Sequence, residues 1–152
     1  MKYENNTMLK IFQVHFETLY MYQKIVAPTF PGSYHIGRGI LFSLACETGL
    51  KALIEKDNIT IPHTHKLNIL FNKLSSTTKD KLIELIQIDV NTFQKLILEN
   101  SSHFEKWRYF AEGCAPIDCQ FLEKLLGTII TILFPLEYLE YCYPVLKERL
   151  VP

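Results

Sequence analysis

The stretch ILFSLACETGLKALIEK, residues 40–56, decides the fold because it is apolar at most positions and polar along one narrow edge. Three of its polar residues, Ser43, Glu47 and Lys51, follow one another at intervals of four, so a helix places them in a single row. We call this row the polar seam. The remaining surface of such a helix requires burial by neighbouring elements. The sequence therefore predicts a central helix with one hydrophilic edge.

Helical spacing of apolar residues continues on the N-terminal side of this stretch. Residues 8–26 predict a helix that has Thr7 as its N-cap and ends at Pro28. Residues 28–39 are rich in Pro and Gly and predict a loop. Its GSYHIGRG stretch could hold a phosphate with backbone N–H groups and Arg38, although no Lys-Ser or Lys-Thr follows as in a P-loop.

Four further helices are predicted on the C-terminal side. They cover residues 65–74, 78–88, 91–111 and 119–133, and Thr64, Thr77 and Asp118 are the expected N-caps of the first, second and fourth. The third is interrupted near ENSS, residues 99–102. No segment shows the alternating pattern of a strand. The sequence therefore predicts an all-α, antiparallel up-and-down helical bundle of about five or six helices, forming a single domain over residues 1–152.

The uncharged run LLGTIITILFPL, residues 125–136, resembles a membrane segment in composition only. It spans about a dozen residues, whereas a bilayer requires roughly 20. We therefore expect a buried core helix and no membrane contact. The N-terminus has no apolar stretch of signal-peptide length, which favours a cytoplasmic location.

Charge and cysteine content exclude several classes of protein. Lys plus Arg equals Asp plus Glu at 16 each, so no overall positive field attracts nucleic acid. The four cysteines form no C-x-x-C pair, and the only close spacing is CAPIDC. Free thiols in a reducing compartment are therefore favoured over a disulfide or a metal site, and no metal or cofactor is predicted. The cysteines are Cys46, Cys114, Cys119 and Cys142.

Three groups of residues are candidates for a site, and each has a structural alternative. His63 and His65 are two positions apart, so a helix would point them to opposite sides and they could not chelate one metal ion from it. His65 therefore either packs at the start of a helix or takes part in catalysis. Glu47 and Lys51 form either an ordinary i, i+4 ion pair or the wall of a polar pocket. Arg108 lies within FEKWRYFAE and either stacks on a neighbouring aromatic ring or binds an anion in a cleft.

Three stretches occur in an order that resembles the HEPN domain, a small helical bundle. They are ETGLKALI (47–54), THKLNILFNKL (64–74) and WRY (107–109), and they lie in the middle of the chain, between residues 47 and 109. The resemblance matches Glu47 and Lys51 to polar positions of one helix and His65 to the histidine that opens another. Lys66 stands where the family usually has Asp. Arg108 and Tyr109 match an Arg-Tyr pair.

The resemblance also implies a function. Many HEPN proteins resemble metal-independent ribonucleases whose signature is Arg, four to six residues, then His. No His follows Arg38 or Arg108 at that spacing. The chain is therefore expected to be catalytically degenerate and to bind a partner protein or a nucleotide-like anion in a stress, toxin–antitoxin or defence context.

The resemblance also implies partners and leaves two alternatives open. A homodimer is expected, with a nucleotidyltransferase or an antitoxin as a further partner and a nucleotide or RNA as the ligand. The first alternative is an RNA-cleaving or nucleotide-modifying toxin that uses His65, Arg108 and Tyr109. The second is a purely structural helical subunit whose polar seam only fixes helix register.

Overall fold

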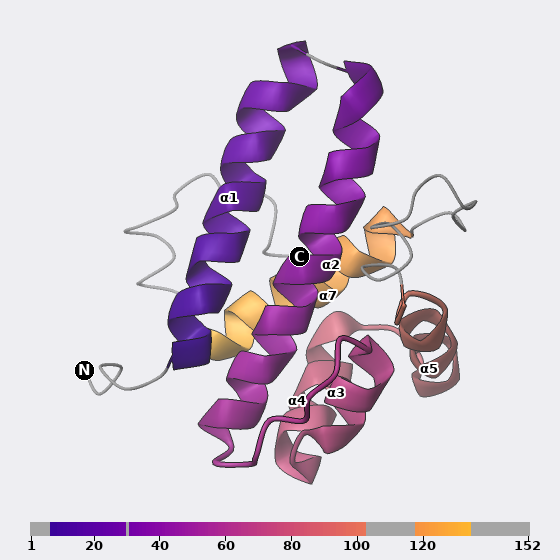
Figure 1. Ribbon diagram of the computed structural model, residues 1–152. Coiled ribbons are helices and arrows are strands. Elements are labelled where there is room, and N and C mark those ends of the chain that lie inside the picture. The colour runs from indigo at the N-terminus through magenta and orange to yellow at the C-terminus, as the bar shows by residue number, and fades with distance from the viewer. Residues whose placement is uncertain (1–6, 30, 103–117, 135–152) are drawn as a thin grey trace.

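The computed structural model describes residues 7–29, 31–102 and 118–134, and every regular element in these ranges is a helix (Figure 1). This confirms the all-α class and the expected number of helices within the described part. The helices are α1 (Thr7–Thr29), α2 (Pro31–Lys56), α3 (Leu67–Lys73), α4 (Ser76–Ile86), α5 (Val90–Glu99) and α7 (Cys119–Leu133).

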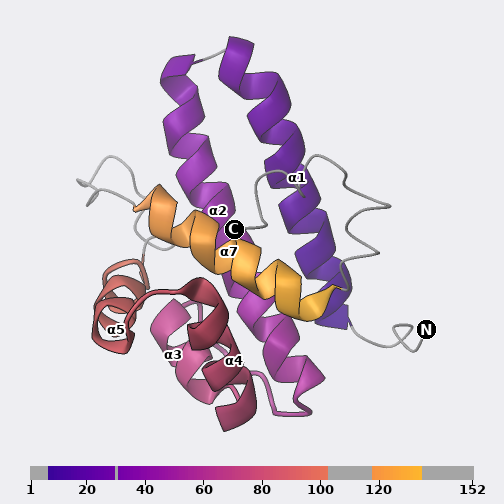
Figure 2. The same cartoon turned by 180° about the vertical axis from the view of Figure 1, so that it is seen from behind.

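The two longest helices, α1 and α2, form an antiparallel hairpin along one side of the molecule (Figure 1). Helix α7 crosses α2 obliquely, behind it in Figure 1 and in front of it in the reverse view of Figure 2. Helices α3, α4 and α5 gather beside the second half of α2. Because α1, α3 and α7 all pack against α2, this helix is central, as residues 40–56 predict.

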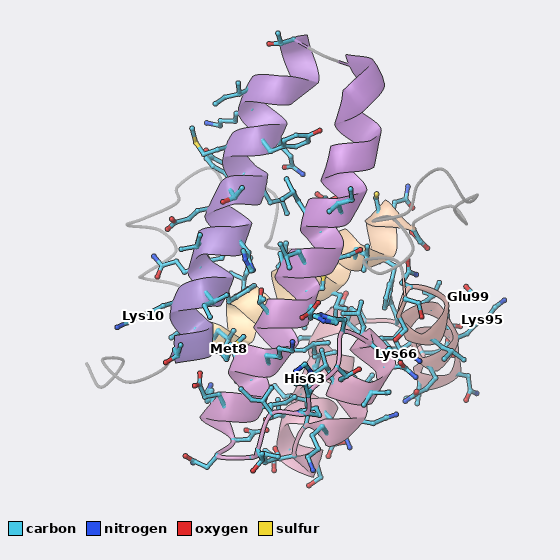
Figure 3. The ribbon with its side chains drawn as sticks, viewed as in Figure 1. Met8, Lys10, His63, Lys66, Lys95 and Glu99 are labelled. Atoms are coloured by element: carbon cyan, nitrogen blue, oxygen red, sulfur yellow. The ribbon has the colours of Figure 1, made fainter. Side chains whose placement is uncertain are left out.

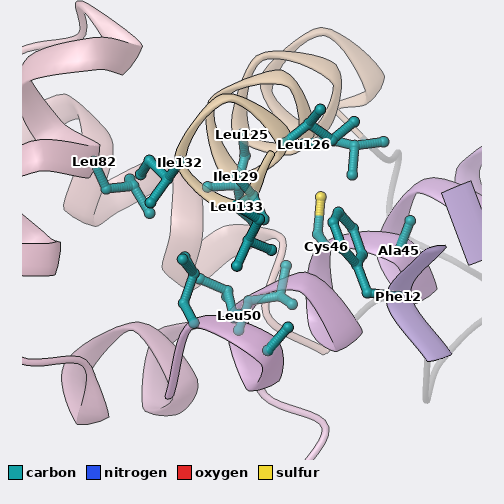
Figure 4. Packing of buried hydrophobic residues seen from close by; sticks show 14 of the residues in the cluster. Phe12, Ala45, Cys46, Leu50, Leu82, Leu125, Leu126, Ile129, Ile132 and Leu133 are labelled. Atoms are coloured by element: carbon teal, nitrogen blue, oxygen red, sulfur yellow. The ribbon is translucent and has the colours of Figure 1, made fainter. Parts of the chain in front are cut away.

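The core between α2 and α7 explains why α2 is so apolar. Ala45, Cys46 and Leu50 of α2 are fully buried, as are Leu125 and Ile129 of α7, and Figure 4 shows Ala45 beside Phe12 of α1. Burial of each such aliphatic side chain contributes about 1.5–3 kcal/mol relative to exposure. The described residues of the uncharged run 125–136 belong to this core and are buried except for one threonine, as predicted. Among the described helices, none is long and apolar enough to cross a membrane.

Two described cysteines are free thiols, as predicted. Cys46 is buried and its Sγ donates to the carbonyl of Leu122 over 3.3 Å, while burial raises its pKa far above the usual value. Cys119 is half-buried, and burial is the largest of the effects that raise its pKa. Both thiols are therefore protonated at neutral pH. Cys114 and Cys142 lie outside the described residues.

The predicted loop over residues 28–39 is wrong. Helix α1 continues to Thr29 and α2 begins at Pro31, so nearly all of this stretch is helical. Pro31 is the first residue of its helix, where a backbone N–H has no intrahelical partner, and Pro28 lies in the last turn of α1. Pro31 is therefore well placed, whereas Pro28 removes one hydrogen bond from the last turn of α1, one residue before the helix ends. Arg38 does not face a phosphate cradle, because its Nη2 pairs with Glu123 of α7 at 3.1 Å.

The structure confirms one of the four predicted N-cap residues. Asp118 caps α7 by accepting a hydrogen bond from the N–H of Phe121 at 3.0 Å, as predicted. Helix α1 begins at Thr7 itself, and Glu55 of α2 accepts from the Met8 N–H at 2.8 Å. A carboxylate distant in sequence therefore accepts from one of the N–H groups that have no intrahelical partner at this N-terminus.

The caps of α3 and α4 differ from the prediction as well. Lys66, without a side-chain hydrogen bond, is the N-cap of α3, because Thr64 already accepts from the Lys66 N–H at 3.2 Å two residues earlier. Ser75 caps α4 in place of Thr77 and accepts from the Thr78 N–H at 3.2 Å. The predicted interruption near residues 99–102 is confirmed, since α5 ends at Glu99; residues 103–111 of that predicted helix lie outside the described residues.

Candidate functional site

Three of the five predicted site residues meet at one carboxylate oxygen. Glu47 Oε1 accepts a hydrogen bond from Lys51 Nζ at 2.6 Å and lies 3.0 Å from Nδ1 of His65. An ionised carboxylate only accepts, so the His65 Nδ1–H is the donor in this contact. The Glu47 side chain is only 4% exposed, whereas that of Lys51 is 15% and that of His65 is 42% exposed. We call these three residues the Glu47 cluster.

Local geometry brings the three side chains together from two segments. Glu47 and Lys51 are one helical turn apart on α2, which makes them neighbours on its surface. His65 comes from the connector between α2 and α3, whose residues His63 and Lys66 are labelled in Figure 3. His65 therefore does not lie in the first turn of a helix, as the sequence suggested, but precedes α3.

Asp57 anchors the beginning of the connector between α2 and α3. It follows α2 directly, and its two carboxylate oxygens accept from the N–H of Ser75 at 3.1 Å and from the hydroxyl of Thr78 at 2.9 Å. These bonds tie the end of α2 to the start of α4. The connector that carries His65 therefore begins at a fixed point.

The polar seam keeps two buried acceptors without hydrogen-bond partners. Glu47 Oε2 and Ser43 Oγ are both shielded from solvent, and neither has a partner in the described part of the protein. Ser43 and Glu47 are one turn apart on α2, so the two atoms belong to the same edge. Each buried unsatisfied group costs about 1–3 kcal/mol. The seam is therefore a polar site that the described side chains do not complete.

His15 of α1 borders the seam, and sequence reasoning missed it. Its Nδ1 lies 3.0 Å from the hydroxyl of Thr48, which already donates to the Leu44 carbonyl at 3.0 Å. Nδ1–H therefore donates to Thr48. Burial lowers the pKa of His15, and the negative charge of Glu47 opposes this effect. The only sequence signal was its place three residues after Phe12, at the edge of the buried face of α1.

A second polar group holds α5 against its neighbours. Ser101 and Asn68 exchange two hydrogen bonds, one of them from the Asn68 N–H to Ser101 Oγ at 2.8 Å. The side-chain carbonyl of Asn100 accepts from the N–H of Asp118 at 3.2 Å. Residues on either side of 103–117 are therefore anchored together beside the start of α3. Arg108 and Tyr109 belong to 103–117 and lie outside the described residues.

The described part of the chain contains no group of three His, Cys, Asp or Glu side chains that could hold a metal ion. Comparison with known proteins gave no match to any protein family, curated protein or solved structure. The likeness to the HEPN domain therefore rests on the three sequence stretches quoted above.

Proposed function

We propose that this chain is a HEPN-like, catalytically degenerate binding protein of the cytoplasm that takes a nucleotide-like anion at the Glu47 cluster. The observation that carries the proposal is the meeting of Glu47, Lys51 and His65 around a buried carboxylate that still has one unpartnered oxygen. A stress, toxin–antitoxin or defence system is the proposed setting.

The charges of the cluster suit a ligand that offers both an anion and hydrogen-bond donors. Lys51 Nζ has three donors, of which Glu47 Oε1 occupies one, so the ammonium group can also donate to a phosphate. His65 is the most exposed member and would meet that phosphate first. Glu47 Oε2 and Ser43 Oγ have no partner among the described residues, and the hydroxyl and amino groups of a nucleotide could supply hydrogen bonds to both.

Arg108 and Tyr109 are proposed as further ligand contacts. The support is indirect: Asn100, Ser101 and Asp118, which flank the segment that contains them, are held beside the start of α3, close in sequence to His65. A guanidinium would add a bidentate phosphate contact.

Titration calorimetry against a panel of inorganic phosphate, AMP, ADP, ATP and GTP tests the proposal. We expect heat with at least one nucleotide, and a loss of at least tenfold in affinity for Lys51→Met and His65→Gln. Two matched controls exist. Lys95→Met removes an exposed lysine with the same i, i+4 spacing to a glutamate, and His63→Gln removes the neighbouring histidine. No heat with any member of the panel would refute the proposal.

One observation favours the alternative of an RNA-cleaving toxin. Glu47 orients His65 through Nδ1, which is how a carboxylate holds an imidazole for general acid–base catalysis. Incubation of the purified chain with a labelled RNA decides between the two. Cleavage that is abolished by His65→Ala and by Arg108→Ala, but kept by His63→Gln, would establish the toxin; intact RNA would exclude it.

We also propose that the chain forms a homodimer and pairs with a nucleotidyltransferase or an antitoxin. The sequence resemblance supports both partners. Sedimentation equilibrium tests the homodimer, and co-expression with the product of a neighbouring gene tests the second partner. If the chain binds neither ligand nor partner, the remaining alternative is a structural helical subunit.

A further inference from the structure

Helix α1 is apolar on two opposite faces, and the described part of the chain covers only one of them. Leu9, Phe12, Phe16 and Leu19 are buried against the rest of the bundle. Two positions further along the helix, and therefore on the far side, stand residues that are exposed. Ile11 is 38%, Val14 59%, Met21 51% and Ile25 57% exposed. With Thr18, which lies between them, we call these residues the outer stripe.

The outer stripe has the spacing of a helix-pairing seam. Its positions 11, 14, 18, 21 and 25 alternate steps of three and four, which is the heptad pattern of coiled coils. Half of the eight exposed large apolar side chains in the described residues lie in it. The hydroxyl of Thr18 donates to the Val14 carbonyl at 2.7 Å, so covering the stripe leaves no polar group unsatisfied there.

The charged residues that border the stripe indicate its partner. Glu17 and Lys24 lie on the same border, each one residue before a stripe position, and Lys10 precedes Ile11 in the same way. When two such helices pack antiparallel, equal borders face each other, so Glu17 of each copy meets Lys24 of the other. In a parallel pair this border would instead meet the opposite one, which holds His15 and Tyr22.

We propose that the outer stripe is the homodimer interface and that two copies pack α1 against α1 in antiparallel fashion. Val14 then packs on Ile25 of the second copy and Thr18 on Met21, with two symmetric Glu17–Lys24 ion pairs at the rim. In Figure 3, Lys10 points away from α2 on this side of α1, where no other described helix lies. The inference rests on the homodimer proposed above and names its surface.

Sedimentation equilibrium between about 5 and about 200 µM tests the surface. We expect the wild-type chain to dimerise and Val14→Glu to raise the dissociation constant at least 100-fold, because each dimer would bury two unpaired charges. Leu98→Glu is the matched control, since Leu98 is 62% exposed on α5 and lies outside the stripe. Circular dichroism verifies that both variants remain helical.

Charge reversal tests the antiparallel register. Glu17→Lys and Lys24→Glu should each weaken self-association about tenfold, and an equimolar mixture of the two should regain wild-type affinity because the mixed dimer restores both ion pairs. A wild-type chain that stays monomeric overturns the homodimer and this inference together. If Val14→Glu does not change the dissociation constant of the dimer, the proposed interface is wrong but the homodimer stands. Weakening without recovery in the mixture overturns the antiparallel register.

Discussion

Replacing Lys51 by Met tests whether Lys51 and Glu47 form a buried ion pair or an ordinary surface pair. In the wild-type protein Lys51 Nζ neutralises a carboxylate that is 4% exposed. Breaking a buried pair by removing one partner costs about 3–5 kcal/mol, whereas an exposed i, i+4 pair contributes about 0.3–0.5 kcal/mol. His65 keeps one hydrogen bond to Glu47, and Lys51 retains some contact with solvent. We therefore expect a loss of about 2–3 kcal/mol in the free energy of unfolding.

Urea denaturation measures this loss. With a slope of about 2 kcal/mol per molar urea, the midpoint should fall by about 1 M or slightly more. The control is Lys95→Met, whose pair with Glu99 spans 3.9 Å and is exposed on both sides; its midpoint should move by no more than about 0.2 M.

A second variant shows that the charge left on Glu47 is the cause. Glu47→Gln combined with Lys51→Met removes both charges, so the double variant should be more stable than Lys51→Met alone. Equal midpoints for Lys51→Met and Lys95→Met would refute the buried pair, and a double variant less stable than Lys51→Met would refute the role assigned to the unpaired charge.

Three further predictions concern packing, capping and pH. Gly49→Ala should lower the free energy of unfolding by about 1–3 kcal/mol in thermal or urea melts, because an added Cβ would lie 2.7 Å from Cγ2 of Ile129; wild-type stability would contradict this contact. Ser75→Ala should cost about 1 kcal/mol and Thr77→Ala less than about 0.5, and the reverse order would contradict the observed cap of α4. The pKa of His15 lies below its usual 6.5 in the folded protein, so the unfolded chain takes up the proton first and stability falls as the pH drops below 6.5. His15→Gln should reduce this fall between pH 7.5 and 5.5, measured by urea unfolding at both values, and an unchanged pH dependence would contradict it.

The sequence predicted the central helix and its seam because both depend on local geometry. Ser43, Glu47 and Lys51 share an edge in any helix, and the apolar remainder of α2 requires burial whatever covers it. The stretch around Pro28 and Pro31 misled the prediction because proline signals a break without saying how short it is. Here each proline occupies a helix end, and the two helices almost abut.

The site could be predicted only in part, because its other features depend on tertiary contacts between residues that lie far apart in sequence. The HEPN resemblance singled out His65, and the structure places that residue on Glu47. Nothing in the sequence linked His15 to Thr48, 33 positions away, or Glu55 to the start of α1, since both contacts depend on how α1 packs against α2. Side-chain partners that lie far apart in sequence leave no periodic signal.

The polar seam makes folding less favourable than an apolar helix edge at the same place would. A buried ion pair can often be replaced by apolar residues of similar volume with no loss of stability, and the unpartnered Glu47 Oε2 and Ser43 Oγ each add a desolvation penalty. A helix that only filled the centre of this bundle would be more stable with leucines in place of Ser43 and Glu47. The proposed ligand would complete these hydrogen bonds, and this cost is the physical argument for the binding site that we propose at α2.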